Sequence, residues 1–129
     1  MTTNAEITQF FFESVDGAAL GLPIAYPSIK FTPPDTGNWL ELSFMPNTGI
    51  DQGLQSDRTL KQGLLQINVG GKPNGGLIPL QTISDTVAAI FPKNSILVDL
   101  VRISRSPYTT DIISLDDRQL LPLTIMYSE

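Results

Sequence analysis

The segment from Pro23 to Pro34, PIAYPSIKFTPP, constrains the fold of this chain more than any other stretch. Each of its prolines fixes φ at about −65° and lacks a backbone N–H donor, and each disfavours helical geometry in the residue before it. The segment therefore cannot be helical and must run extended. Because proline cannot donate a hydrogen bond inside a sheet, we expect this ribbon along a sheet edge or as a broken strand entering the sheet.

The composition excludes several classes of function. The chain has 129 residues, which suits one domain, and it contains neither cysteine nor histidine. Disulfides, thiolate metal sites and histidine-assisted nucleophiles are therefore excluded. The net charge is −5 and the basic residues are scattered, so we expect no nucleic-acid-binding stripe. No apolar run reaches the roughly 18–20 residues of a membrane span, and the N-terminus has no secretory pattern, so a soluble, untargeted protein is predicted.

Two helices are predicted from hydrophobic periodicity and capping residues. The first covers residues 2–15, with Thr3 as N-cap and Glu6 completing a capping box, and it ends at Asp16-Gly17. Phe12 lies off its apolar stripe and is interpreted as part of a broad core face, or alternatively as a subunit contact. The second helix covers residues 77–91, with Pro79 in its first turn and Pro92 after its end.

Strands are predicted from alternation of apolar and polar residues. Residues 38–45 and 59–69 should pair as an antiparallel hairpin, and residues 95–104, apolar on both faces, should form a central strand. Residues 120–127 form the closing strand, which Pro122 places at an edge, and a short strand is possible at residues 111–114. The fold class is therefore α+β, a mainly antiparallel β-sheet with two α-helices packed on one face and a proline-rich edge segment.

Only two groups of residues suggest chemistry. The Gly70–Gly76 turn, GGKPNGG, directly precedes a helix, so a small anion- or ligand-binding module is one possible function. Its lysine comes too early for a P-loop and is followed by proline, so a flexible turn is favoured. Asp111, Asp116 and Asp117 could hold a hard cation or act as acid and base, but a solvated turn is favoured. We expect no enzyme, no metal and no cofactor.

The ordered motifs of the chain resemble the tail terminator proteins of long-tailed bacteriophages. The resemblance extends over about residues 5–127 and rests on LPIAYPSIKFTPPDTGNWLELSFMPN, LKQGLLQINVGGKPNGG and AAIFPKN. The turn at Pro73-Asn74 departs from the plainer turn expected there. The matching positions are Leu22, Pro23, Ala25 and Pro27, then Phe31, Pro33 and Pro34, then Trp39, then Gly63, Gln66 and Ile67, and finally Phe91-Pro92.

This resemblance implies a structural virion protein. Such proteins form a ring, typically a hexamer, that caps the finished tail tube, stops its polymerisation and provides the docking surface for the head or neck. The implied partners are further copies of the chain, the tail tube protein and a head-completion or neck protein, assembled in the bacterial host cytoplasm. Six copies at −5 each would carry about −30 formal charges, so genome DNA would pass the lumen without specific binding. Another neck or tail-tube ring protein is the main rival within this class.

Two sets of residues are predicted to contact partners. Trp39 shares a face with Glu41 and is expected on the solvent or partner side, either partly exposed and packed over a neighbouring loop or as an interface residue. In the second case, replacing it should weaken assembly without unfolding the monomer. The long polar loop over residues 46–58 contains two unusual apolar residues, Ile50 and Leu54, which either tuck back onto the sheet or wait for a partner. This loop is the first candidate for contact with the tail tube. The predicted subunit interface is Phe10, Phe11, Phe12, Trp39, Glu41, Asp99 and Arg102; the predicted tube contacts are Asn47, Ile50, Asp51, Leu54, Asp57 and Arg58.

Overall fold

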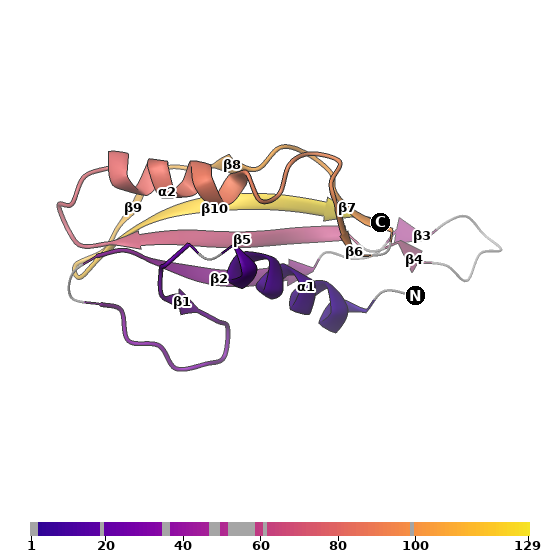
Figure 1. The fold of residues 1–129 in the computed structure, drawn as a ribbon, viewed down its shortest axis with the longest axis horizontal. Helices are drawn as coiled ribbons and strands as arrows, with labels where there is room; N and C mark the ends of the chain where they lie inside the picture. Colours follow the sequence, from indigo (N-terminus) through magenta and orange to yellow (C-terminus); the bar gives the residue numbers. More distant parts are fainter. Residues whose placement is uncertain are drawn as a thin grey trace.

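The computed structural model describes residues 3–18, 20–34, 37–46, 50–51, 59–60, 62–98 and 100–129. These residues form two helices and a mixed, mostly antiparallel sheet, so the predicted α+β class is confirmed (Figure 1). The helices are α1 (Asn4–Gly17) and α2 (Ile78–Ala88). The strands are β1 (Ile24–Ala25), β2 (Trp39–Pro46), β3 (Ile50–Asp51), β4 (Thr59–Leu60), β5 (Gln62–Gly71), β6 (Ile96–Val98), β7 (Val101–Ile103), β8 (Tyr108–Thr109), β9 (Ile113–Ser114) and β10 (Gln119–Ser128).

Eight of these strands form one sheet in the order β1-β2-β5-β10-β7-β6, with β8 and β9 also paired to β10. The predicted hairpin is confirmed, because β2 and β5 are antiparallel with Leu42 opposite Ile67. The strand predicted over residues 59–69 is divided, since β4 pairs with β3 in a separate two-stranded sheet and only β5 joins the main sheet.

The proline-rich segment contains no helix, as predicted, and contributes the short strand β1 at one end of the strand order. β1 runs parallel to β2, with Ile24 opposite Leu40. Pro23 takes part as an acceptor, because its carbonyl oxygen receives a 2.9 Å hydrogen bond from the Leu40 N–H. Pro23 stands directly before the strand, a position where a sheet tolerates proline.

The prediction that β10 is an edge strand is wrong. β10 pairs with β5 over its whole length, and its other side pairs in turn with β9, β8 and β7. The carbonyl of Pro122 accepts a hydrogen bond from Thr110 N–H, so the ring nitrogen of Pro122 also points to that side. Residues 110–112 interrupt the pairing between β8 and β9 there. A central strand tolerates this proline because its missing donor faces the gap.

β7, β8 and β9 behave as one interrupted strand that runs antiparallel to β10. Between the pairs Tyr127–Ile103 and Thr124–Tyr108, β10 advances three residues while its partner advances five. Extra residues of this kind form bulges, which bend a strand and break its simple alternation. The pattern in residues 105–118 therefore indicated turns and one possible short strand, and β8 was not predicted.

Residues 95–104 do not form the predicted central strand. They form the hairpin β6–β7, in which Val98 lies opposite Val101, at the far edge of the sheet. The apolar residues of the predicted strand belong to two short strands: β7 buries Val101 and Ile103, whereas β6 buries Val98 and leaves Ile96 exposed. Sequence alternation alone does not distinguish one long strand buried on both faces from a tight hairpin.

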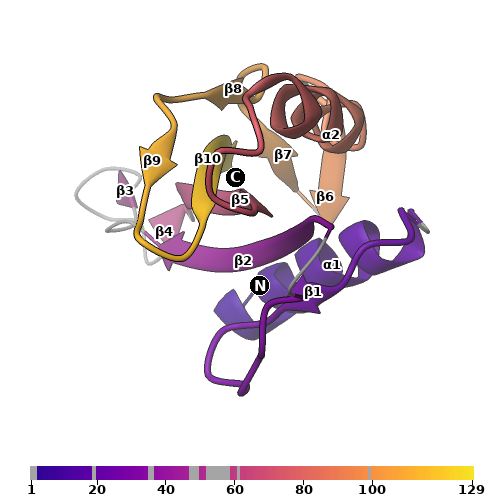
Figure 2. The ribbon, with the colours of Figure 1, turned by 90° about the vertical axis from the view of Figure 1, so that its left-hand side faces the viewer.

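Both helices cover one side of the sheet, which we call the inner face (Figure 2). The Thr3 hydroxyl accepts from the Glu6 N–H at 3.1 Å, which confirms the predicted N-cap of α1. α1 packs near β2 and β6, and α2 packs on β5 and β10. A single core joins the elements through residues that include Ile7, Phe11, Val15, Leu80, Val87, Leu42, Ile67, Leu123, Ile125 and Val101. Neither helix in the described part of the chain is long and apolar enough to span a membrane.

Candidate assembly surface

The opposite side of the sheet, the outer face, carries no helix. Strand register places its side chains in rows across β2, β5 and β10. One end has the row Trp39–Gly70–Leu120, the middle rows are polar, and the other end has the row Met45–Leu64–Met126. We call these ends the tryptophan end and the arginine end, the latter for the two arginines described below.

The tryptophan end is closed by the chain itself. The indole of Trp39 lies over Gly70, where an added Cβ would collide with the ring, so only glycine fits this position. Trp39 is 2% exposed. A cavity of about 240 Å³ beside it is lined by the proline-rich segment, the glycine-rich turn and the start of β10, through Pro33, Pro34, Lys72, Pro73, Asp117 and Arg118.

The expectation that Trp39 lies on the solvent or partner side is therefore wrong. Trp39 does share the outer face with Glu41, as predicted, but segments distant in sequence cover it. Alternation places a residue on a face without showing whether a loop returns over that face. Because its indole is buried within the protomer, Trp39 is a core residue of the protomer and is not accessible to a partner.

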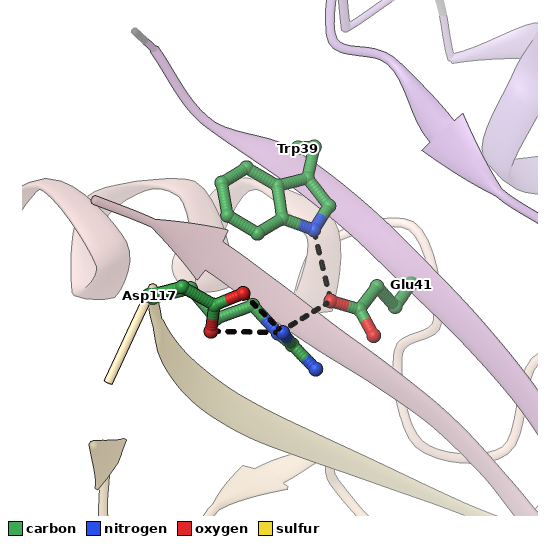
Figure 3. Close-up of polar contacts among 4 residues, drawn as sticks. Trp39, Glu41 and Asp117 are labelled. Atoms are coloured by element: carbon green, nitrogen blue, oxygen red, sulfur yellow. Dashed lines mark hydrogen bonds and ion pairs between the residues drawn. The ribbon is translucent and has the colours of Figure 1, made fainter. Parts of the chain in front are cut away.

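A small polar network anchors this end (Figure 3). The Trp39 Nε1–H donates to Glu41 Oε2 at 2.9 Å, and the same oxygen lies 4.0 Å from the Arg118 Nε. The Arg118 Nη1 also donates to both carboxylate oxygens of Asp117 at 3.0 and 3.1 Å. A buried indole N–H needs an acceptor, so Glu41 serves the fold of this subunit.

The arginine end remains open. Met45 and Tyr108 are each 38% exposed and Ile96 is 62% exposed, all on the outer face. The Arg105 guanidinium lies 4.9 Å from the centre of the Tyr108 ring, and its Nη1 is 3.9 Å from Met126 Sδ. Pairing with Ser128 and Ile96 puts Arg102 on the same face, and both arginines are exposed. We call the set Met45, Leu64, Ile96, Arg102, Arg105, Tyr108 and Met126 the arginine patch.

This patch combines exposed apolar groups with two arginines that form no ion pair with a carboxylate of the described residues. Arg118 pairs with Glu41 and Asp117, whereas neither Arg102 nor Arg105 takes part in such a pair within the described ranges. Exposed apolar surface rimmed by charge is typical of protein–protein contact sites, and arginine is enriched at them. Arg102 was predicted as an interface residue; Arg105, Tyr108 and Met126 were missed because the bulged strand hides their alignment. The one sequence signal for Met126 was its position on the same strand face as Pro122 and Thr124.

The three phenylalanines of α1 have different surroundings. Phe11 is fully buried in the core, and Phe12 packs on it and on Tyr26, with ring centres 5.6 and 5.0 Å apart. The interpretation of Phe12 as part of a broad core face is confirmed. Only Phe10, at 43% exposure, presents a large part of its ring to the outside. Phe11 is thus removed from the set of accessible contact residues.

Most of the predicted tube-contact residues lie outside the described residues. These are Asn47, Leu54, Asp57 and Arg58, and the same is true of the predicted interface residue Asp99. Ile50 and Asp51 are described as strand β3, paired with β4. β3 and β4 lie at the end of the molecule that also carries β6, β7 and the C-terminus (Figure 1). The tail-tube role of this region stays a prediction.

Neither the Gly70–Gly76 turn nor the three aspartates form a well-built binding site. The Gly70–Gly76 turn borders a cavity of about 220 Å³ that is lined by Lys72 and by Gln119. The buried Oε1 of Gln119 has no hydrogen-bond partner in the part of the chain that the structure describes. An unpaired acceptor oxygen does not favour an anion there. Among the residues that the structure describes, no three aspartate or glutamate side chains converge on a possible metal site, so Asp111 is not brought to Asp116 and Asp117.

Comparisons with protein families and with solved structures each give a match over most of the chain. A family model described as "Phage tail terminator protein" matches residues 6–127. Among the curated proteins, none matches the sequence. One solved structure, whose name states no function, aligns with a TM-score of 0.74 at 24% identity and covers 98% of this chain and 96% of its own. At that identity the likeness shows the fold alone.

Proposed function

Since the chain belongs to the phage tail terminator protein family, we propose that it forms a closed ring that caps the completed tail tube. The family is one of structural proteins, so the chain is a structural component of the phage tail. In the proposed role the ring stops tube polymerisation and gives the head or neck its docking surface. The tube, the neck protein and further copies of the chain are the partners of this proposal.

The observation that carries this proposal is the contrast within the outer face. A protein with no partner would be expected to cover both ends of its sheet, yet only the tryptophan end is covered. The arginine patch leaves apolar side chains and two arginines accessible on a surface to which six strands contribute. An assembling subunit needs such a surface, whereas a free monomer gains nothing from it.

The acidic balance of the chain supports a passive route for DNA. The net charge is −5 per subunit, and the basic residues are scattered along the sequence. A closed ring multiplies this charge by the number of its subunits, and a negative lumen repels phosphate. The duplex would then slide through the ring without specific binding.

The test is assembly in the presence and absence of tubes. Light scattering and electron microscopy are applied to the purified protein alone and mixed with purified tail tubes. The proposal predicts discrete rings, or monomers that become a single cap on tube ends. Long open tubes made of this protein would identify a tube subunit instead, and a monomer indifferent to tubes would contradict the proposal.

A further inference from the structure

We propose that the arginine patch of one subunit receives the exposed face of α1 from the next subunit in the ring. This inference rests on the proposed ring and specifies how its subunits join. The contact is head-to-tail: one subunit contributes α1, and its neighbour contributes the outer face of the sheet. The occupant of the open patch is therefore a second copy of this chain.

The exposed face of α1 is acidic and has one aromatic side chain. Phe10 stands between Glu6 and Glu13, four residues before it and three after it, so all three lie on neighbouring turns. α1 has no basic residue anywhere. Glu6 accepts a hydrogen bond from the Thr3 hydroxyl and Glu13 accepts one from the Gln9 amide, both neutral donors. In the described part of the chain neither glutamate has a cationic partner.

The arginine patch is complementary to this face. It offers Met126, Leu64 and Tyr108 as apolar and aromatic contacts for Phe10, and Arg102 and Arg105 as partners for the glutamates. Arg105 already lies over an aromatic ring and beside a thioether, so its guanidinium is held at the surface. Charge-assisted hydrogen bonds between arginine and carboxylate add direction to the apolar contact. Complementary charge of this kind fixes register and speeds association.

The two surfaces lie on opposite sides of the sheet. α1 turns Ile7, Phe11 and Val15 toward the inner face, which leaves Phe10 directed away from the core. The arginine patch is on the outer face. The proposed contact joins α1 of one subunit to the arginine patch of the next, so each subunit still has one of the two surfaces free. The same contact can therefore repeat from subunit to subunit. Repeated head-to-tail contacts form a ring when the rotation closes.

The absence of native cysteine allows a direct test. Phe10→Cys and Met126→Cys are made as two separate proteins and treated with a short bifunctional thiol cross-linker under the conditions that give rings or caps. We expect the mixture to yield cross-linked dimers, and each protein alone to yield none. The double variant should give a ladder whose largest species equals the ring size. A mixture of Phe10→Cys with Gln81→Cys, an exposed position on α2, is the matched control and should not cross-link.

A charge exchange provides the second measurement. Arg105→Glu and Glu13→Arg each place like charges opposite each other, and we expect the concentration needed for ring formation to rise at least about tenfold in each. The double variant restores the pair with its signs exchanged and should recover most of the wild-type ring yield. All three proteins should unfold at the wild-type temperature, because both positions are exposed.

The outcomes separate this inference from the proposed function. If rings form but Phe10→Cys and Met126→Cys do not cross-link in them, the inference is overturned and the proposed ring stands. Cross-linking within either single variant alone would also overturn it, since it requires a two-fold contact. Failure of the wild-type protein to form rings or caps under any condition would contradict the proposed function itself.

Discussion

The two ends of the outer sheet face are built from the same strands but have opposite surroundings. At the tryptophan end, a large aromatic ring is 2% exposed beneath segments that return over the sheet. At the arginine end, a row of methionine, leucine and methionine stays accessible beside two arginines. The first end uses its apolar surface to stabilise the protomer, and the second leaves its apolar surface accessible.

The difference shows that an exposed residue type does not identify an interface by itself. Tryptophan is the residue most associated with binding hot spots, yet here it lies in the core of the subunit. The arginine patch contains less conspicuous residues and is accessible. The changes below test this contrast, beginning with the largest expected loss of protomer stability.

Trp39→Ala should destabilise the protomer by about 3–5 kcal/mol, since it removes a buried ring and leaves the Glu41 carboxylate without its indole donor. Urea unfolding followed by circular dichroism measures the effect. Rings would be lost only because the subunit unfolds. A variant that stays as stable as wild type but fails to assemble would restore Trp39 to the interface and break the comparison.

Gly70→Ala should cost about 1–3 kcal/mol, because the new methyl group would collide with the Trp39 indole and force the ring to move. The same unfolding experiment applies, with Gly17→Ala as a matched control, because a Cβ at Gly17 would meet nothing within 4 Å. Equal stability of the two variants would show that Trp39 is not held against Gly70.

Tyr127→Phe tests the inner face beneath the arginine end. The Tyr127 hydroxyl is buried and has no hydrogen-bond partner among the described residues, so its removal should leave stability unchanged or raise it by up to about 1 kcal/mol. The aromatic stacking with Phe44, whose ring centre is 5.9 Å away, is retained. A loss above about 1 kcal/mol would indicate a hydrogen bond that this geometry lacks.

The same variant has a predicted pH dependence. Burial raises the pKa of Tyr127, so above about pH 10 the unfolded chain loses this proton more readily than the folded one. Wild-type stability should be unaffected by Tyr127 below that pH and should fall as the pH rises through the folded-state value. Burial, and secondarily the charge of Asp16, also raises the pKa of Tyr26, so Tyr127→Phe should reduce this alkaline loss without abolishing it.

Arg105→Glu should have the smallest effect on the protomer, within about 0.5 kcal/mol, because the side chain is exposed. Thermal unfolding at a concentration below that of assembly measures it. If the variant unfolds several degrees earlier than wild type, the arginine end contributes to the fold and the contrast between the two ends fails.

Much of the fold was predictable from local pattern. Alternation located β2 and β5 and their pairing, and capping residues located α1. Pro122 was misleading because its tolerance depends on a gap in the neighbouring strand, 110–112, that no local rule describes. Residues 95–104 were assigned to one strand because a tight hairpin of apolar residues has the same pattern as a buried strand.

The candidate site was less predictable because it depends on which loops return over the sheet. Glu41 and Trp39 were correctly placed on one face. The sequence around them, however, does not indicate that Pro33 and Arg118 lie over this face. Arg105 reaches Met126 across 21 positions of sequence and only after the bulges between β7 and β8. Contacts of this kind follow from topology and not from local periodicity.

Hydrogen exchange of the assembled ring, compared with the dissociated protomer, tests the central claim that the arginine end is the part that gains a partner. We predict new protection in α1 and in residues 96–108, with the amides around Trp39 and Gly70 equally slow in both states. New protection at residues 33–41 and 117–118, with none in α1 or residues 96–108, would contradict the account.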